Sequence, residues 1–226
     1  MSKRTIFIWD VHWCYDELKL LIKELKLSEE DKVFFVGDYI NKWPKSFKVL
    51  KFLYKNKDQF FGVLWNHDYH FLEWVKWKEV SYWTKTFKKL KKKLEEYPEI
   101  LNFYKNMPLY IENKNFILVH AWIENAIELN NQKIDILTSV REINKKLWYK
   151  NYNWDKKIIY WHNALDGLQI RENTVWLDSG CVYWKSLTAY VLETWEIYSQ
   201  NALDNYVDVY KKIKNEFKPK TGRSKK

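Results

Sequence analysis

The chain has 226 residues, of which 46% are hydrophobic, and it carries a formal net charge of +10 at pH 7. Its length suits one packed domain, and no apolar run is long enough to cross a bilayer, which excludes a membrane-spanning protein. Only four of the 39 basic residues are arginine, a lysine bias typical of an AT-rich gene, so we do not expect nucleic acid as a partner.

The first third of the chain alternates apolar runs with amphipathic segments. Buried strands are predicted at 5–10, 32–38 and 60–68. Helices, with apolar residues at three- and four-residue steps, are predicted at 15–27, 46–56 and 69–77. Three such units in succession indicate an α/β fold with parallel strands. The first strand begins so close to residue 1 that we expect no signal peptide and a cytoplasmic protein.

The middle of the chain is rich in lysine and has a helical pattern, with Pro98 as a breaker. We interpret residues 75–108, approximately, as a helical cap insertion. Residues 109–122 predict a hairpin with its turn at 112–115.

Short strands and turns follow at 156–167, 174–180 and 186–193, and they are typical of a second sheet. We therefore expect two sheets packed face to face with helices outside, in one domain over residues 1–200. Residues 201–226 are expected to form a C-terminal helix and a basic, disordered tail.

Polar clusters stand at the ends of the predicted strands. They comprise Asp10 and His12; Asp38 with Asn41 and Lys42; Asn66, His67 and Asp68; His120; and His162. The carboxyl ends of parallel strands converge on one crevice, so these clusters predict a single site.

The residue types in these clusters predict a metal centre. Carboxylate, amide and imidazole donors together suit Mn, Fe, Zn or Co better than Ca or Mg. The set is too large for one tetrahedral ion and contains no cysteine, which argues against a structural zinc site. We expect two divalent ions that share one carboxylate, for which Asp38 is the candidate.

With these residues in place, the chain resembles the calcineurin-like, phosphoprotein-phosphatase-type metallophosphoesterases. The family motifs GDxHG, GDxxDRG, GNH(D/E), HAG and GH read here as WDVHW, GDYINKW, WNHD, HAW and WH, in the same order. The resemblance runs from Thr5 to about Glu196 and implies a two-sheet αββα sandwich. Further stretches, such as VLWNHDYHFL and LDSGCVYWKSLTAYVLE, resemble the symmetric bis(5'-nucleosyl)-tetraphosphatase branch.

The resemblance implies a role for each candidate residue. The first ion would be held by Asp10, His12 and Asp38, and the second by Asp38, Asn66, His120 and His162. The catalytic group would comprise His67, Asn41 and Asp68, with His67 as the general acid. Lys42 replaces the arginine that binds phosphate in the family, and Arg171 is a candidate to assist it.

The expected reaction is the Mn²⁺-dependent hydrolysis of diadenosine tetraphosphate to two ADP. A phosphoprotein (Ser/Thr) or small phosphomonoester phosphatase on the same site is the alternative, because the chain is short for the tetraphosphatase branch between His120 and His162.

Tryptophan stands at many positions where the resembling family has glycine. These are Trp9, Trp13, Trp43, Trp65, Trp122, Trp161, Trp176 and Trp184, and Trp195 is assigned to the same set. An indole would fill space meant for ions and phosphate. We hypothesise that the gene encodes these positions by UGA, which some bacteria read as glycine and common translation tables render as tryptophan. If the tryptophans are real, the chain is instead expected to be an inactive relative that binds nucleotide or nucleic acid.

Overall fold

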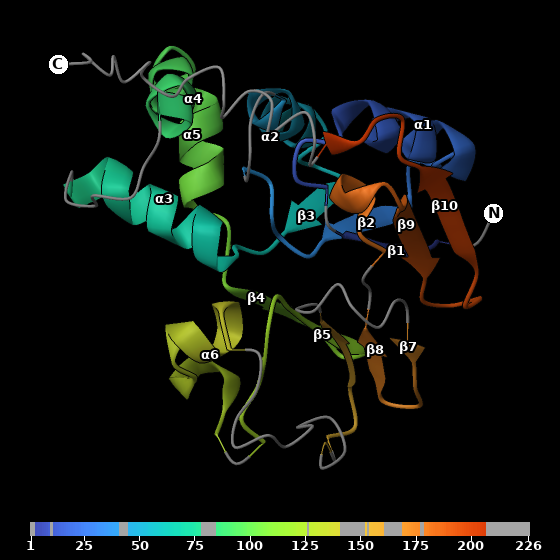
Figure 1. The fold of residues 1–226 in the computed structure, drawn as a ribbon. Coiled ribbons are helices and arrows are strands. Elements are labelled where there is room, and N and C mark those ends of the chain that lie inside the picture. Colours follow the sequence, from blue (N-terminus) through green and yellow to red (C-terminus); the bar gives the residue numbers. More distant parts are fainter. Residues whose placement is uncertain are drawn as a thin grey trace, which may run out of the picture.

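Two five-stranded sheets form the centre of the protein in the computed structural model. The structure describes residues 3–9, 11–40, 45–77, 85–125, 127–140, 152, 154–160, 169–176 and 179–206. The strand order is β10-β9-β1-β2-β3 in the first sheet and β4-β5-β6-β8-β7 in the second. Figure 1 shows α1 and α2 on the outer side of the first sheet and α6 beside the second. The expected α/β fold with two sheets flanked by helices is confirmed.

The first sheet contains the three predicted parallel strands. Its members are β1 (Thr5–Trp9), β2 (Lys32–Phe35), β3 (Phe60–Gly62), β9 (Ser186–Val191) and β10 (Ile197–Asn201). Strands β1, β2 and β3 are parallel, whereas β9 is antiparallel to β1. The prediction placed residues 186–193 in the second sheet, and this was wrong: Tyr190 pairs with Phe7 of β1.

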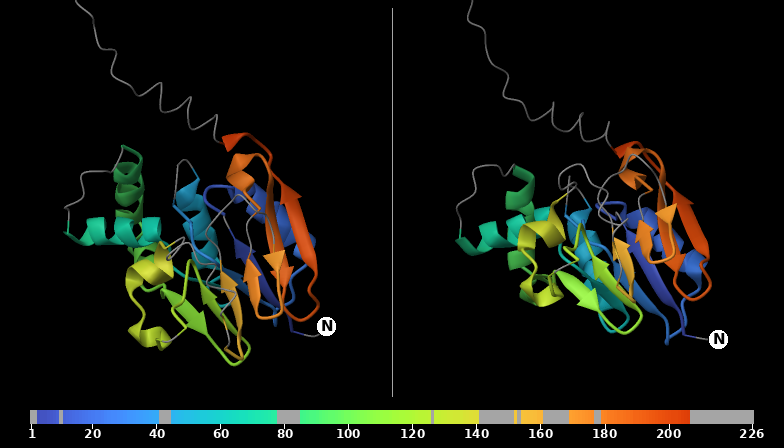
Figure 2. Two further views of the ribbon diagram at one scale, coloured as in Figure 1. Left: turned by 60° about the horizontal axis from the view of Figure 1, so that its bottom comes forward. Right: turned by 90° about the horizontal axis from the view of Figure 1, so that it is seen from below.

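Five helices follow the parallel strands or lie beside them. They are α1 (Tyr15–Leu25), α2 (Ser46–Lys55), α3 (Asn66–Trp77), α4 (Lys85–Glu95) and α5 (Pro98–Lys105). Helix α3 begins at Asn66, three residues earlier than predicted, so His67 lies in a helical first turn and not at the end of a strand. Figures 1 and 2 show α3, α4 and α5 on the side of the molecule away from β10.

The second sheet contains the predicted hairpin. Its members are β4 (Tyr110–Glu112), β5 (Phe116–Val119), β6 (Lys157–Tyr160), β7 (Gln169–Ile170) and β8 (Thr174–Trp176). The remaining described helices are α6 (Ile134–Thr138) and the short 3₁₀ helices η1 (Leu129–Asn131) and η3 (Cys181–Tyr183). Strands β4 and β5 are antiparallel. The Asn113 side-chain oxygen accepts hydrogen bonds from the backbone N–H groups of Asn115 (2.8 Å) and Phe116 (3.0 Å), which fixes the turn.

Alternating side chains of β1 divide the core into two parts. Phe7 and Trp9 point between the sheets, where the Phe7 ring meets Phe116 edge-on at a centroid distance of 4.9 Å. Ile6 and Ile8 point the other way, toward the residues buried by α1 and α2. Such an alternation requires both faces of the sheet to be covered, and each fully buried large apolar side chain contributes roughly 1.5–3 kcal/mol.

Two further regions were assigned from the sequence. Residues 85–105 form α4 and α5, which pack on α2 and on each other; their role as a cap stays a prediction. Of the expected C-terminal segment, residues 201–206 are described, and residues 207–226 lie outside the described residues. Within the described part, no helix has the length and hydrophobicity required to cross a membrane.

Candidate active site

The loops after β1 and β2 bring an imidazole and a carboxylate together. His12 Nδ1 lies 2.9 Å from Asp38 Oδ1, and both side chains are almost completely buried. Both residues adopt left-handed backbone conformations, with φ of 42° for His12 and 66° for Asp38. Such conformations are uncommon for residues other than glycine and cluster where function requires them. The sequence therefore folds each loop back sharply to present these two side chains to each other.

His120 reaches the same place from the second sheet. It directly follows β5, and its Nδ1 donates a hydrogen bond of 2.6 Å to the carbonyl oxygen of Val36, in the loop after β2. A metal-binding histidine characteristically donates its second ring N–H to a carbonyl or carboxylate in this way. The bond fixes the tautomer, so that Nε2 carries the lone pair available to an ion.

Gly37 makes this close approach possible. Its φ is +102°, and a Cβ at this position would lie 3.1 Å from both His120 Nδ1 and the Trp65 Cβ. Any side chain would therefore push the loop after β2 away from His120. Of the glycines in the candidate motifs, this one has a clear geometric requirement.

Asp68 holds the loops together. Its carboxylate is completely buried and accepts hydrogen bonds from the Asp38 backbone N–H (3.1 Å), the Trp65 backbone N–H (3.2 Å) and the Tyr104 hydroxyl (2.6 Å). Burial raises the pKa of Asp68 to about 6, although these hydrogen bonds oppose the shift. Its hydrogen bonds join the loop that carries Asp38, the residue before Asn66, and helix α5; the catalytic role expected of Asp68 stays a prediction.

Trp65 occupies the space between the histidines. Its ring centroid is 4.5 Å from that of His67, 4.8 Å from that of His120 and 6.1 Å from that of His12. The side chain is buried. A ring of this size thus separates the groups that would have to converge on an ion.

Other tryptophans of the set show two kinds of misfit. Trp184 and Trp195 are exposed and have φ of 68° and 63°, a region that favours glycine. Trp9, Trp13 and Trp176 have buried indole N–H groups without a hydrogen-bond partner among the described residues. Each such group costs about 1–3 kcal/mol. Among the described tryptophans of the set, the left-handed conformation occurs at Trp184 and Trp195, and Trp9, Trp13, Trp65, Trp122 and Trp176 do not adopt it.

The donor set fits a divalent metal ion. It offers imidazole from His12 and His120, a carboxylate from Asp38, and the amide oxygen of Asn66, which is buried and has no hydrogen-bond partner in the described part of the chain. A buried acceptor of this kind is satisfied by a cation. In the described part of the chain, the ligand atoms of His12, Asp38 and His120 do not all lie close enough to one another to hold a single ion. The Trp65 ring lies between His12 and His120 and accounts for this separation.

The remaining predicted residues are placed as follows. Asp10, Asn41, Lys42 and His162 lie outside the described residues. Arg171 is not brought to the site: it forms the turn before β8, at the amino end of that strand, and its guanidinium donates to the Gln169 side chain. The site lies at the carboxyl ends of β1, β2 and β5. Because β8 is parallel to β6 and β6 is parallel to β5, the amino end of β8 lies at the opposite edge of the second sheet.

Sequence reasoning missed two groups that build the site, the Val36 carbonyl and Tyr104. Tyr104 lies on α5, far from every motif, and no local pattern marks it. The Val36 carbonyl was discoverable in principle, since it lies in the loop that carries Asp38.

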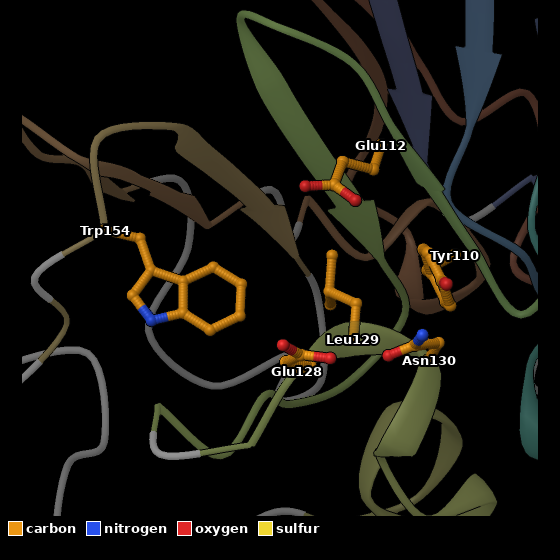
Figure 3. Close-up of a pocket in the computed structure, with 6 residues that line it drawn as sticks. All are labelled: Tyr110, Glu112, Glu128, Leu129, Asn130 and Trp154. Atoms are coloured by element: carbon orange, nitrogen blue, oxygen red, sulfur yellow. The ribbon is translucent and has the colours of Figure 1, made fainter.

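A separate pocket of about 340 Å³ lies beside β4 and η1 and contains none of the predicted site residues (Figure 3). It is lined by Tyr110, Glu112, Glu128, Leu129, Asn130 and Trp154. Two carboxylates in its wall disfavour a polyphosphate, and Glu112 already pairs with Lys156 at 2.5 Å. We therefore do not assign the site to this pocket.

Comparison with known proteins gives a consistent result. The family model for calcineurin-like phosphoesterases matches residues 3–198. A symmetrical bis(5'-nucleosyl)-tetraphosphatase from Vibrio parahaemolyticus is 28% identical, with 73% of this chain and 62% of that protein covered. The asymmetrical bis(5'-nucleosyl)-tetraphosphatase PrpE from Oceanobacillus iheyensis is also 28% identical, with 81% and 86% covered. The chain thus spans less than two thirds of the symmetrical relative but most of the asymmetrical one.

The fold is also that of solved structures. A crystal structure provisionally assigned as a diadenosine tetraphosphatase superposes with a TM-score of 0.71 at 24% identity, covering 90% of this chain and 96% of that one. A metallophosphoesterase from Sphaerobacter thermophilus gives a TM-score of 0.63 at 12% identity, covering 97% and 96%. The family model spans most of the chain, and the two-sheet fold and the strand-end residues agree with it. The chain therefore belongs to the calcineurin-like phosphoesterase family, which implies divalent metal ions.

Proposed function

We propose that the protein is a metal-dependent hydrolase that cleaves the phosphoanhydride chain of diadenosine tetraphosphate, with two ADP as products. The observation that carries this proposal is the contact of His12 with Asp38, with His120 bonded to the same loop through the Val36 carbonyl, at the carboxyl ends of three strands. The family has relatives that are named tetraphosphatases. A loop carbonyl already fixes His120 in the orientation that a metal ligand needs.

Two divalent ions fit the proposed ligands, and Mn²⁺ is our preferred choice for this mixture of oxygen and imidazole donors. The first would be held by Asp10, His12 and Asp38, and the second by Asp38, Asn66, His120 and His162. When bound, such ions supply Lewis acidity and lower the pKa of water to near neutral.

The chain's own residues supply positioning and a proton. His67, in the first turn of α3, would donate its imidazole proton to the leaving phosphate oxygen. Asp68 fixes the loops that carry Asp38 and Trp65 through their backbone N–H groups. Lys42 and Asn41 are proposed to face the phosphates and His67, respectively. A nucleoside diphosphate is a good leaving group, so the substrate makes only a modest demand on His67.

We further infer that the native protein carries glycine in place of tryptophan in the site. The position of the Trp65 ring between three histidines supports this, as do the left-handed conformations of Trp184 and Trp195. The buried indole N–H groups of Trp9, Trp13 and Trp176, which have no hydrogen-bond partner among the described residues, support it too. The glycine form is defined as the chain with Gly at 9, 13, 43, 65, 122, 161, 176, 184 and 195.

The mass of the tryptic peptide Thr5–Lys19, from protein made in its native host, tests this inference directly. A peptide lighter by two Trp-to-Gly differences supports it. A peptide that contains both Trp9 and Trp13 overturns it and favours an inactive, ligand-binding relative.

Product analysis of the glycine form tests the reaction. With Mn²⁺ and diadenosine tetraphosphate, we expect ADP as the sole nucleotide product. Asymmetrical cleavage to ATP and AMP is the second candidate, because the asymmetrical relative matches this chain over 86% of its own length. Hydrolysis of a phosphopeptide or of a small phosphomonoester, without hydrolysis of the dinucleotide, would overturn the proposal.

A further inference from the structure

A second group of side chains that could hold a metal ion lies on the helix side of the first sheet. Cys14, Glu17 and Cys181 each offer one ligand atom, these atoms lie within 4.8 Å of one another, and all three residues are fully buried. Cys14 is the N-cap of α1, Glu17 lies three residues later, and Cys181 begins η3. Residues three apart at the start of a helix share a face, so Cys14 and Glu17 lie on the same side of α1, next to Cys181 of η3.

Glu17 is the feature that packing alone does not explain. The Leu203 backbone N–H donates to its Oε1 at 2.9 Å, and the Tyr206 hydroxyl donates to the same oxygen. Its Oε2 is buried and has no hydrogen-bond partner among the described residues. A carboxylate oxygen in an apolar core is costly unless a cation compensates it.

We propose that Cys14, Glu17 and Cys181 bind a Zn²⁺ ion that has a structural role. Thiolates select zinc among the common divalent ions, and zinc accepts a carboxylate as a further ligand. Each cysteine that binds the ion releases its thiol proton to solvent. Leu203 and Tyr206 hold one carboxylate oxygen, which leaves the other for the ion. The two cysteines do not form a disulfide, and a disulfide would leave Glu17 Oε2 uncompensated.

The ion would fix the start of α1 relative to η3 and to the C-terminal end of the described chain. Cys14 is two residues beyond His12, so the same ion would also steady the loop that carries His12. None of the three ligands is a tryptophan of the glycine form, and none is a proposed ligand of the active-site ions. The zinc site therefore stands or falls separately from the proposed function.

Substitution with Co²⁺ tests the site. The proposed active-site ligands contain no sulfur and the chain has two cysteines, so thiolate-to-cobalt charge-transfer absorption in the near ultraviolet reports this site alone. We expect that absorption in the Co²⁺-loaded protein, together with at least one equivalent of zinc in the protein as isolated. We expect Cys181→Ser to abolish the absorption, and Glu17→Gln to weaken cobalt binding at least tenfold.

His120→Asn is the matched control, because it should keep the thiolate absorption while it weakens metal binding at the active site. If Cys181→Ser fails to fold, thiol titration of the unmodified protein decides instead: both thiols should react slowly with zinc bound and quickly after chelation. Equal reactivity in both states, absence of the charge-transfer absorption, or a mass lower by two hydrogens that reveals a disulfide would each overturn the proposal.

Discussion

Strand β2 has a buried aspartate near each end, and the two lie in contrasting surroundings. Asp31, before the strand, accepts hydrogen bonds from the Arg4 backbone N–H (2.9 Å), the Arg4 guanidinium (2.6 Å) and the Ser28 N–H (2.8 Å). Burial alone would raise the pKa of Asp31, but these partners outweigh it and lower the pKa to about 2. The fold thus supplies everything that this carboxylate needs.

Asp38, after the strand, lies against His12 in a left-handed conformation. Its partner is not a fixed cation but an imidazole, which is itself a proposed metal ligand. The contrast teaches where to look for function: a carboxylate that the protein compensates fully stabilises the fold, whereas one held beside a histidine at a strained turn is a candidate to bind an ion.

The largest expected effect separates these two aspartates directly. In the glycine form, Asp38→Asn should lower kcat/KM for diadenosine tetraphosphate by more than about 100-fold, because a neutral amide replaces the carboxylate proposed to bind both ions. Its free energy of unfolding, measured by urea titration, should change by less than about 1 kcal/mol. Comparable losses of activity per folded molecule in Asp38→Asn and Asp31→Asn would contradict the contrast.

A second prediction concerns the proton donor. His67→Asn should lower kcat by about 100-fold if His67 protonates the leaving oxygen. The loss should be larger for an alkyl phosphomonoester, because its alkoxide leaving group needs a proton more than a nucleoside diphosphate does. His70→Asn is the matched control, because His70 is on the same helix but exposed. A loss independent of the leaving group would assign His67 a different role.

The third prediction concerns Asp31 and its effect on stability. A pKa lowered from 3.8 to about 2 corresponds to about 2 kcal/mol of stability. Because the folded pKa is the lower one, this contribution is present above pH 4 and is lost as the pH falls from about 4 to 2. Asp31→Asn should therefore destabilise the protein by about 2 kcal/mol at pH 7, with little change in kcat/KM.

Urea titrations at several pH values provide the check. The difference between the parent chain and Asp31→Asn should narrow as the pH falls below 4. A difference that stays constant from pH 7 to pH 2.5 would show that packing, and not the carboxylate charge, accounts for the loss.

Local patterns in the sequence were sufficient to predict the strands and the polar residues at their ends. Asp38 and His120 stand next to apolar runs, so the ends of the strands and their convergence could be predicted from periodicity alone. The pairing of β9 with β1 could not, because residues nearly the whole chain apart meet there and either sheet would accept an alternating strand. The family resemblance implied a catalytic role for Asp68, which stays a prediction. Its partner Tyr104 could not be predicted, because it is on a distant helix that no motif connects to Asp68.

Tyr104 allows the smallest predicted effect, and it sharpens the contrast for a third carboxylate, Asp68. Tyr104→Phe keeps the ring but removes the hydroxyl that donates to Asp68 Oδ1 at 2.6 Å. A buried acceptor that loses one donor costs about 1–2 kcal/mol in the free energy of unfolding. Tyr97→Phe, a control between α4 and α5, should change the free energy of unfolding by less than about 0.5 kcal/mol.

The activity should respond as well. Because Asp68 also accepts hydrogen bonds from the backbone N–H groups of Asp38 and Trp65, we expect kcat/KM to fall severalfold in Tyr104→Phe but not in Tyr97→Phe. A loss of stability with unchanged kcat/KM would show that Asp68, like Asp31, stabilises the fold and does not contribute to activity.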